Sequence, residues 1–208
     1  MKKIKLIVAL CFVAVVNAHA AELYEGYLVG RVSQGFDRGE LASCGLTVSA
    51  IEIPKAGAGP NDKLLTFNGS FSLIDLQGGL IKGRAGSIDK KSLGSNNLGP
   101  SSIKPLPTES VWFKAPKVKR THPREGVKLG KSEDPGYVLY ASSAESIIGV
   151  IGAVHDQLPI HIGMKVKDRK FDEVLYGTMN LSDSDREQFR QCVADWSELA
   201  RKKLDSAQ

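Results

Sequence analysis

Two cysteines far apart in the chain, Cys44 and Cys192, limit how this protein can fold more than any other feature. A third, Cys11, lies in the opening stretch MKKIKLIVALCFVAVVNAHA, which has lysines, then an apolar run, then a small-x-small end. This order is typical of a secretory signal, and we expect cleavage after Ala20. The remaining pair would then enter a compartment where disulfides form and persist. The sequence therefore predicts a periplasmic or secreted protein that contains one disulfide.

Removal of residues 1–20 leaves residues 21–208, which we expect to form a single globular domain. The formal charge of +5 includes three lysines of the signal, so the mature chain carries 25 basic against 23 acidic residues, a net charge of +2. The apolar run of the signal is shorter than the about 20 residues that cross a bilayer, and no later segment approaches that length. We therefore expect no transmembrane segment.

The residues around each cysteine place it on an apolar face. In CGLTVSAIEI, Cys44 shares one parity with three apolar residues, so a strand would point all four toward the same side of a sheet. Near the C-terminus, Ser184 and Glu187 have capping-box spacing, and the apolar stripe that follows, which runs through Trp196, includes Cys192. We predict a bridge that attaches a C-terminal helix to the sheet.

Periodicity elsewhere predicts strands and one further helix. Two-residue alternation or strand-forming composition marks the ranges 24–32, 65–73, 80–88, 110–114, 137–141, 160–166 and 172–179, with a turn at Gly78-Gly79. A helix is predicted within 142–159, with Ser142 and Glu145 at capping-box spacing. Residues 89–109 lack apolar periodicity and predict a mobile loop. The order of elements indicates an α+β fold, with a mostly antiparallel sheet and about two helices on one face.

A basic segment, FKAPKVKRTHPREGVKLGK, is the most distinctive candidate site. We expect a basic loop over residues 114–131, in which seven cations face only Glu125: Lys114, Lys117, Lys119, Arg120, Arg124, Lys128 and Lys131. Clustered cations bind and steer anions, so the loop could hold an acidic partner protein, anionic lipid or polysaccharide. A solvated loop without a ligand is the alternative. The segment lacks interleaved aromatics, which disfavours nucleic acid. Alternation places one of Trp112 and Phe113 in the core.

Catalytic and metal-binding patterns are not evident. The three histidines of the mature chain lack the paired spacing of a zinc site, and His161 has the outward parity of its strand. Neither cysteine lies beside a histidine, as a nucleophile would. We therefore predict no cofactor, no metal and no catalytic residues, although a hydrolase site assembled from distant residues stays open.

These patterns favour an exported, non-enzymatic protein of the bacterial envelope that acts by binding another macromolecule. An inhibitor or immunity-type partner of an envelope enzyme, or an accessory of an envelope assembly, fits this description. The alternative is a binder of anionic lipid or polysaccharide through the basic loop.

Overall fold

The computed structural model describes residues 21–75, 78–94, 102–123 and 130–205. Within these residues the chain forms one sheet of eleven strands, two α-helices and a short 3-10 helix. The predicted signal at residues 1–20 lies outside the described residues, as do Arg124 and Lys128 of the basic loop.

The strands follow one another along most of the chain. Their bounds are β1 Glu22–Asp37, β2 Glu40–Glu52, β3 Lys63–Asp75, β4 Gly78–Asp89, β5 Lys104–Pro105, β6 Thr108–Lys114, β7 Gly130–Lys131, β8 Val138–Ser143, β9 Ile160–Val166, β10 Glu173–Gly177 and β11 Met179–Asn180. The helices are η1 Lys90–Gly94, α1 Ala144–His155 and α2 Asp183–Asp205. The sheet order is β6-β9-β10-β1-β2-β3-β4-β8-β7, and β1 pairs in parallel with β10 and β11 while the other pairs are antiparallel. The predicted α+β class is confirmed.

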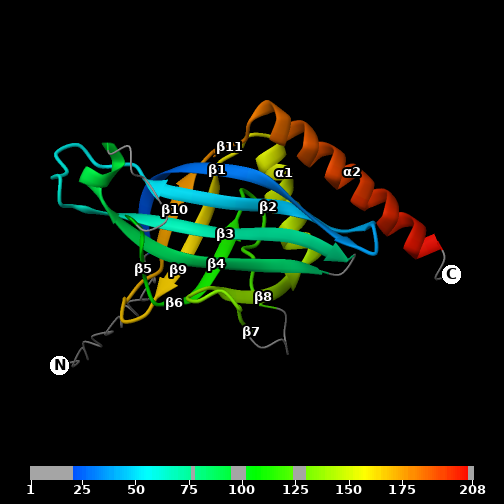
Figure 1. The fold of residues 1–208 in the computed structure, drawn as a ribbon, viewed down its shortest axis with the longest axis horizontal. Coiled ribbons are helices and arrows are strands. Elements are labelled where there is room, and N and C mark those ends of the chain that lie inside the picture. Colours follow the sequence, from blue (N-terminus) through cyan, green and yellow to red (C-terminus); the bar gives the residue numbers. More distant parts are fainter. Residues whose placement is uncertain (1–20, 76–77, 95–101, 124–129, 206–208) are drawn as a thin grey trace, which may run out of the picture.

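The sheet curls around its own apolar face (Figure 1). Cross-strand pairing aligns Leu46 with Phe71, Phe71 with Ile81, and Ile81 with Tyr140, so these buried side chains share the concave side. Phe113 of β6, from the other end of the sheet order, packs edge-on against Phe71 with ring centroids 5.1 Å apart. The core therefore fills the interior of the curl.

The two ends of the sheet order also meet through the backbone. The amide of Leu106, just before β6, donates to the carbonyl of Ala85 in β4 at 3.0 Å. Part of the predicted loop at 89–109 takes part in this closure, because Pro105 pairs with Gly86 and Lys104 with Ser87. The expected loop is thus strand or 3-10 helix at both its ends, while residues 95–101 lie outside the described residues. Backbone pairing needs no apolar alternation, which explains why composition indicated a loop.

Helix α1 lies against one end of the curl, with Ile147 and Val150 fully buried. The glycine pair at this end is part of β4 and not a turn, because Gly78 pairs with Asp75 and Gly79 with Leu73 of β3. The backbones approach so closely there that a Cβ at Gly79 would lie 1.9 Å from the carbonyl oxygen of Ser72. The predicted capping box is also wrong. The helix begins at Ala144, and Ser142 continues β8 with its side chain buried.

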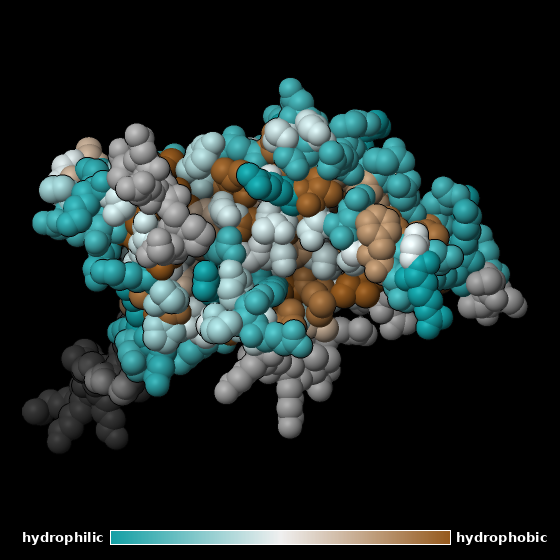
Figure 2. All heavy atoms as spheres, in the orientation of Figure 1, coloured by the Kyte–Doolittle hydropathy of each residue, from teal (hydrophilic) through white to brown (hydrophobic). Residues whose placement is uncertain are grey.

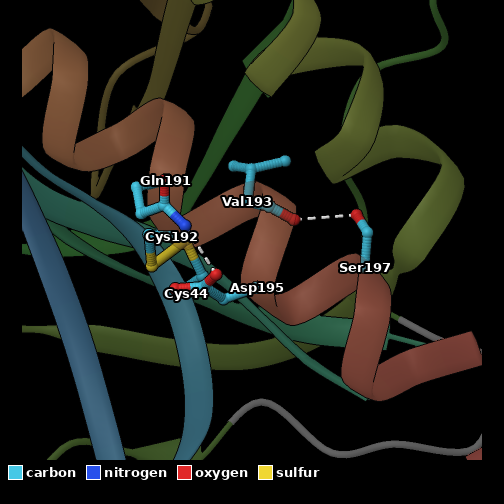
Figure 3. Close-up of a disulfide and its surroundings, with 6 residues drawn as sticks. All are labelled: Cys44, Gln191, Cys192, Val193, Asp195 and Ser197. Atoms are coloured by element: carbon cyan, nitrogen blue, oxygen red, sulfur yellow. Dashed lines mark hydrogen bonds between the residues drawn. A yellow bond between two sulfur atoms is a disulfide. The ribbon is translucent and has the colours of Figure 1, made fainter. Parts of the chain in front are cut away.

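Helix α2 packs on β1 and β2 from the same concave side and carries the disulfide (Figures 1 and 3). Cys44 and Cys192 are bonded, both 0% exposed, with Cα atoms 5.8 Å apart, as predicted. The helix begins at Asp183, earlier than expected, and its N-cap is Ser182 in place of Ser184. The hydroxyl of Ser182 accepts a hydrogen bond from the amide of Asp185 at 3.0 Å. Figure 2 shows a hydrophilic outer side on this helix, consistent with its single buried stripe.

Candidate functional site

Strand β6 sorts its side chains between the core and the surface. Val111 and Phe113 are buried in the concave interior, while Trp112 and Lys114 lie on the outer side. The prediction that one of the two neighbouring aromatics belongs to the core is confirmed, and that residue is Phe113. The other aromatic, Trp112, becomes part of a surface that also carries the first cations of the basic loop.

The segment after β6 is fixed to the body of the protein. The amide of Phe113 donates to the hydroxyl of Thr121 at 2.9 Å, and the amide of Thr121 donates to the carbonyl of Phe113 at 2.7 Å. The Tyr140 hydroxyl lies 3.1 Å from that of Thr121. Val118 packs on α1 at Gly149, where a Cβ would lie 2.5 Å from its side chain. These contacts hold residues 115–121 in a defined path, so the cations there are presented from a fixed loop.

A cleft of about 530 Å³ lies on the outer side of β6 and β9, beside the β9–β10 turn. Its lining comes from three parts of the chain: Ala21, Trp112, Arg120, Lys165, Lys170, Phe171 and Asp172. In Figure 1, β6, β9 and β10 run next to one another near the N-terminal end of the described chain. The amide of Glu22 donates to the carbonyl of Asp172 at 3.0 Å, which fastens that end beside the cleft.

The indole of Trp112 is held in place on several sides. Its Nε1 donates to the carboxylate of Asp172 at 2.8 Å. The guanidinium of Arg120 lies over the ring, 5.7 Å from its centroid. Gly163 of β9 lies against the ring, because a Cβ there would come within 1.9 Å of an indole carbon. The contacts with Gly163 and Arg120 reduce the part of the ring that is open for stacking a base or a sugar.

Three cations and one carboxylate give the cleft a net positive charge. Arg120 and Lys170 are exposed, and the ammonium of Lys165 donates to the carbonyl of Lys170 at 3.2 Å, which restrains its position. Asp172 is occupied by the indole donor. An anionic group entering the cleft would therefore meet prearranged positive charge, with little side-chain reorganisation required.

A histidine on the same outer side, His161, has a lowered pKa. His161 lies opposite Lys114 across β6 and β9 and stacks on Tyr176 with ring centroids 6.0 Å apart. Burial and then the charge of Lys114 hold the pKa of His161 below its usual range. The ring is half-buried on the outer side, in agreement with its predicted parity, and the lowered pKa favours its neutral form at pH 7.

The basic residues predicted as one site over 114–131 do not gather in one place in the structure. Exposed side chains are found at Lys114, Lys117, Lys119 and Arg120, and of these only Arg120 lines the cleft. Lys131 belongs to β7, which pairs with β8, and Arg124 and Lys128 lie outside the described residues.

Sequence reasoning missed the second contributor to the cleft. Lys165, Lys170 and Asp172 come from the polar β9–β10 turn, which the alternation pattern marked only as a connection. The signal that could have found them is the pairing of β6 with β9, which sets Ser110 opposite Lys165 and Trp112 opposite Gly163.

Among the described residues, no group of three or more histidine, cysteine, aspartate or glutamate side chains is arranged to hold a metal ion. In the same part of the chain, no helix is long and apolar enough to cross a membrane. Comparison with protein-family models, curated proteins and solved structures finds no match to this chain, so its function must be argued from the geometry of the cleft.

Proposed function

We propose that this chain is an exported binding protein of the bacterial envelope, without catalytic activity, whose basic cleft holds an acidic surface of a partner protein. One observation carries the proposal: Arg120 and the pair Lys165 and Lys170, more than forty residues apart in sequence, line a single cleft around a clamped indole. Cations gathered from separate segments, of which Lys165 is restrained by a backbone hydrogen bond and Arg120 by the indole, suit an anion-recognising surface.

A protein partner fits the cleft better than a ligand that binds by ring stacking. Gly163 and Arg120 both lie against the Trp112 indole, which leaves less of the ring for a base or a sugar to stack on. Carboxylates of an acidic loop or helix need only hydrogen-bond donors and positive charge, which the cleft supplies. An inhibitor, an immunity-type protein or an accessory of an envelope assembly would each use such a surface to select a partner and speed its encounter.

A second candidate is a binder of anionic lipid or polysaccharide. Its support is the exposure of Lys114, Lys117 and Lys119, which extend positive charge beyond the cleft along the fixed loop. A broad surface of this kind attracts a polyanion through charge alone, and such attraction decreases steeply with salt.

The test is capture of partners from an envelope fraction at low and high salt, with the tag at the C-terminus. The cleft variant is Arg120→Gln/Lys170→Gln. Its matched control is Arg190→Gln/Lys202→Gln, which removes the same charge from exposed positions on α2.

A single protein retained at high salt, lost with the cleft variant and kept by the control, is the expected result. Lipid or polysaccharide that elutes with salt would favour the second candidate. Equal capture by all three forms would contradict a role for the cleft in either.

A further inference from the structure

The curled sheet has a second polar site at the end opposite α1. At this end a pocket of about 230 Å³ opens between the start of β1, the end of β2, the start of β3 and the β9–β10 turn. Its polar lining residues are Tyr24, Glu52, Lys63, Ser87, Arg169 and Glu173. The cleft described above shares none of these residues, so the two sites are separate.

The pocket has its polar character because the inward-facing rows of the sheet change from apolar to polar at this end. On β2 the inward parity that includes Ala50 continues to Glu52, and on β3 Phe67 continues to Leu65, whose amide donates to the Glu52 carboxylate at 3.0 Å. On β10, Glu173 pairs with Met164, which is fully buried in the interior. Two carboxylates therefore point toward the interior from strands that are distant in sequence.

Glu173 is the unusual member of this group. It is only 2% exposed, and one carboxylate oxygen, Oε1, forms an ion pair with Arg169. The other oxygen, Oε2, is buried and has no hydrogen-bond partner. A buried carboxylate oxygen that lacks a donor is costly, and such a group in a native protein calls for an explanation such as a bound ligand.

The neighbouring tyrosine lies within hydrogen-bond reach of two carboxylates, Glu22 and Glu173, but has a single proton to donate. The Tyr24 hydroxyl donates its single proton to the carboxylate of Glu22 at 2.6 Å. Burial, together with hydrogen bonding to the Glu22 and Glu173 carboxylates and their charge, raises the pKa of this hydroxyl. Two cations also line the pocket: Lys63, which is exposed, and Arg169, which is exposed and pairs with Oε1 of the buried Glu173.

We propose that this pocket binds a primary ammonium group, with Glu173 and Glu52 as its carboxylate acceptors. An ammonium carries three N–H donors and one positive charge, so it can satisfy Glu173 Oε2 and offset the interior carboxylates together. The remaining lining is apolar, from Leu64, Leu65 and Leu106, and suits a short alkyl chain. The pocket is smaller than sites for drug-sized ligands, which begin near about 300 Å³, so the ligand is a small amine or a lysine side chain.

Titration calorimetry at fixed ionic strength tests the proposal on the whole mature chain. The probes are n-butylammonium, which has three donors, and tetramethylammonium, which has the same charge and none. We expect saturable binding of n-butylammonium alone. The variant Glu173→Gln should weaken it by at least about ten-fold, since a charge-assisted hydrogen bond to a buried carboxylate is lost. Glu187→Gln, an exposed carboxylate change on α2, should bind like the unmodified chain.

Glu52→Gln provides a second variant if Glu173→Gln unfolds, because an amide oxygen can still accept from Leu65, and it should also weaken n-butylammonium binding. N-acetyl-lysine amide identifies the source of the ligand. Binding of this probe supports a lysine side chain of a partner, and its failure beside bound n-butylammonium supports a small free amine. Absence of n-butylammonium binding, equal binding of tetramethylammonium, or binding unchanged in both carboxylate variants would overturn the proposal.

Discussion

Removing the disulfide should cost this protein a large part of its stability, and the structure gives the size of the effect. The bridge joins residues separated by 148 positions, so it restricts the unfolded chain over most of its length. In the chain-entropy model a closed loop of this size stabilises the folded state by about 5 kcal/mol at 25 °C. Domains of ordinary size have total stabilities of about 5–15 kcal/mol. The reduced protein should therefore be marginally folded.

The experiment is urea unfolding of the oxidised chain, the chain with reductant, and Cys44→Ala/Cys192→Ala. With a slope of about 2–3 kcal/mol per molar urea, the loss should lower the midpoint by about 2 M. The variant should lose somewhat more, because both sulfur atoms are fully buried and their removal leaves small cavities. Reductant should not affect the variant. If the midpoint of the unmodified chain moves by less than about 0.5 M with reductant, the entropic argument is wrong.

Three further predictions concern single residues. Gly149→Ala should destabilise the protein by about 1–3 kcal/mol in thermal unfolding, because its Cβ would collide with the Val118 side chain. Gly152→Ala should instead stabilise the protein by up to about 1 kcal/mol in the same assay, because the space around Gly152 is open and alanine favours the helix. Ser182→Ala should cost about 1 kcal/mol through loss of the α2 cap, and Ser184→Ala should cost little; equal losses in urea would contradict the assigned cap. Burial raises the pKa of Tyr140 to about 12 from an ordinary 10.0, so the folded form keeps a proton that the unfolded chain releases. That contribution, about 2–3 kcal/mol, is complete below pH 10 and lost as the pH rises toward 12, and unfolding of Tyr140→Phe, followed from pH 9 to 12, should lack this part of the pH dependence.

Local periodicity was enough to predict the elements that hold the molecule together. Cys44 lies on a strand whose alternate residues are buried, and Cys192 lies on a helix whose buried positions recur every three or four residues. Both patterns depend only on the geometry of one element. The orientation of each cysteine, and hence their pairing, could be read from the residues beside it.

The cleft could not be predicted in the same way, because it depends on which strands pair. Arg120 meets Lys165 and Lys170 only because β6 pairs with β9, and that register is set by non-local packing such as Phe113 on Phe71. The predicted start positions of the two helices were wrong for a related reason. A serine can cap a helix or continue the preceding strand, and Ser142 takes the second course because β8 pairs with β4 up to Ser143.

The bridge also determines what a protease can release from this protein. Every residue that lines the basic cleft, apart from Ala21, lies between Cys44 and Cys192 in the sequence. A single cut in any loop between the two cysteines would yield two polypeptides that remain joined under oxidising conditions. In denaturing electrophoresis such a nicked molecule would migrate as one species without reductant and as two with it. The residues that line the basic cleft would stay in the disulfide-linked molecule. A single cut would free a fragment only if it fell before Cys44 or after Cys192.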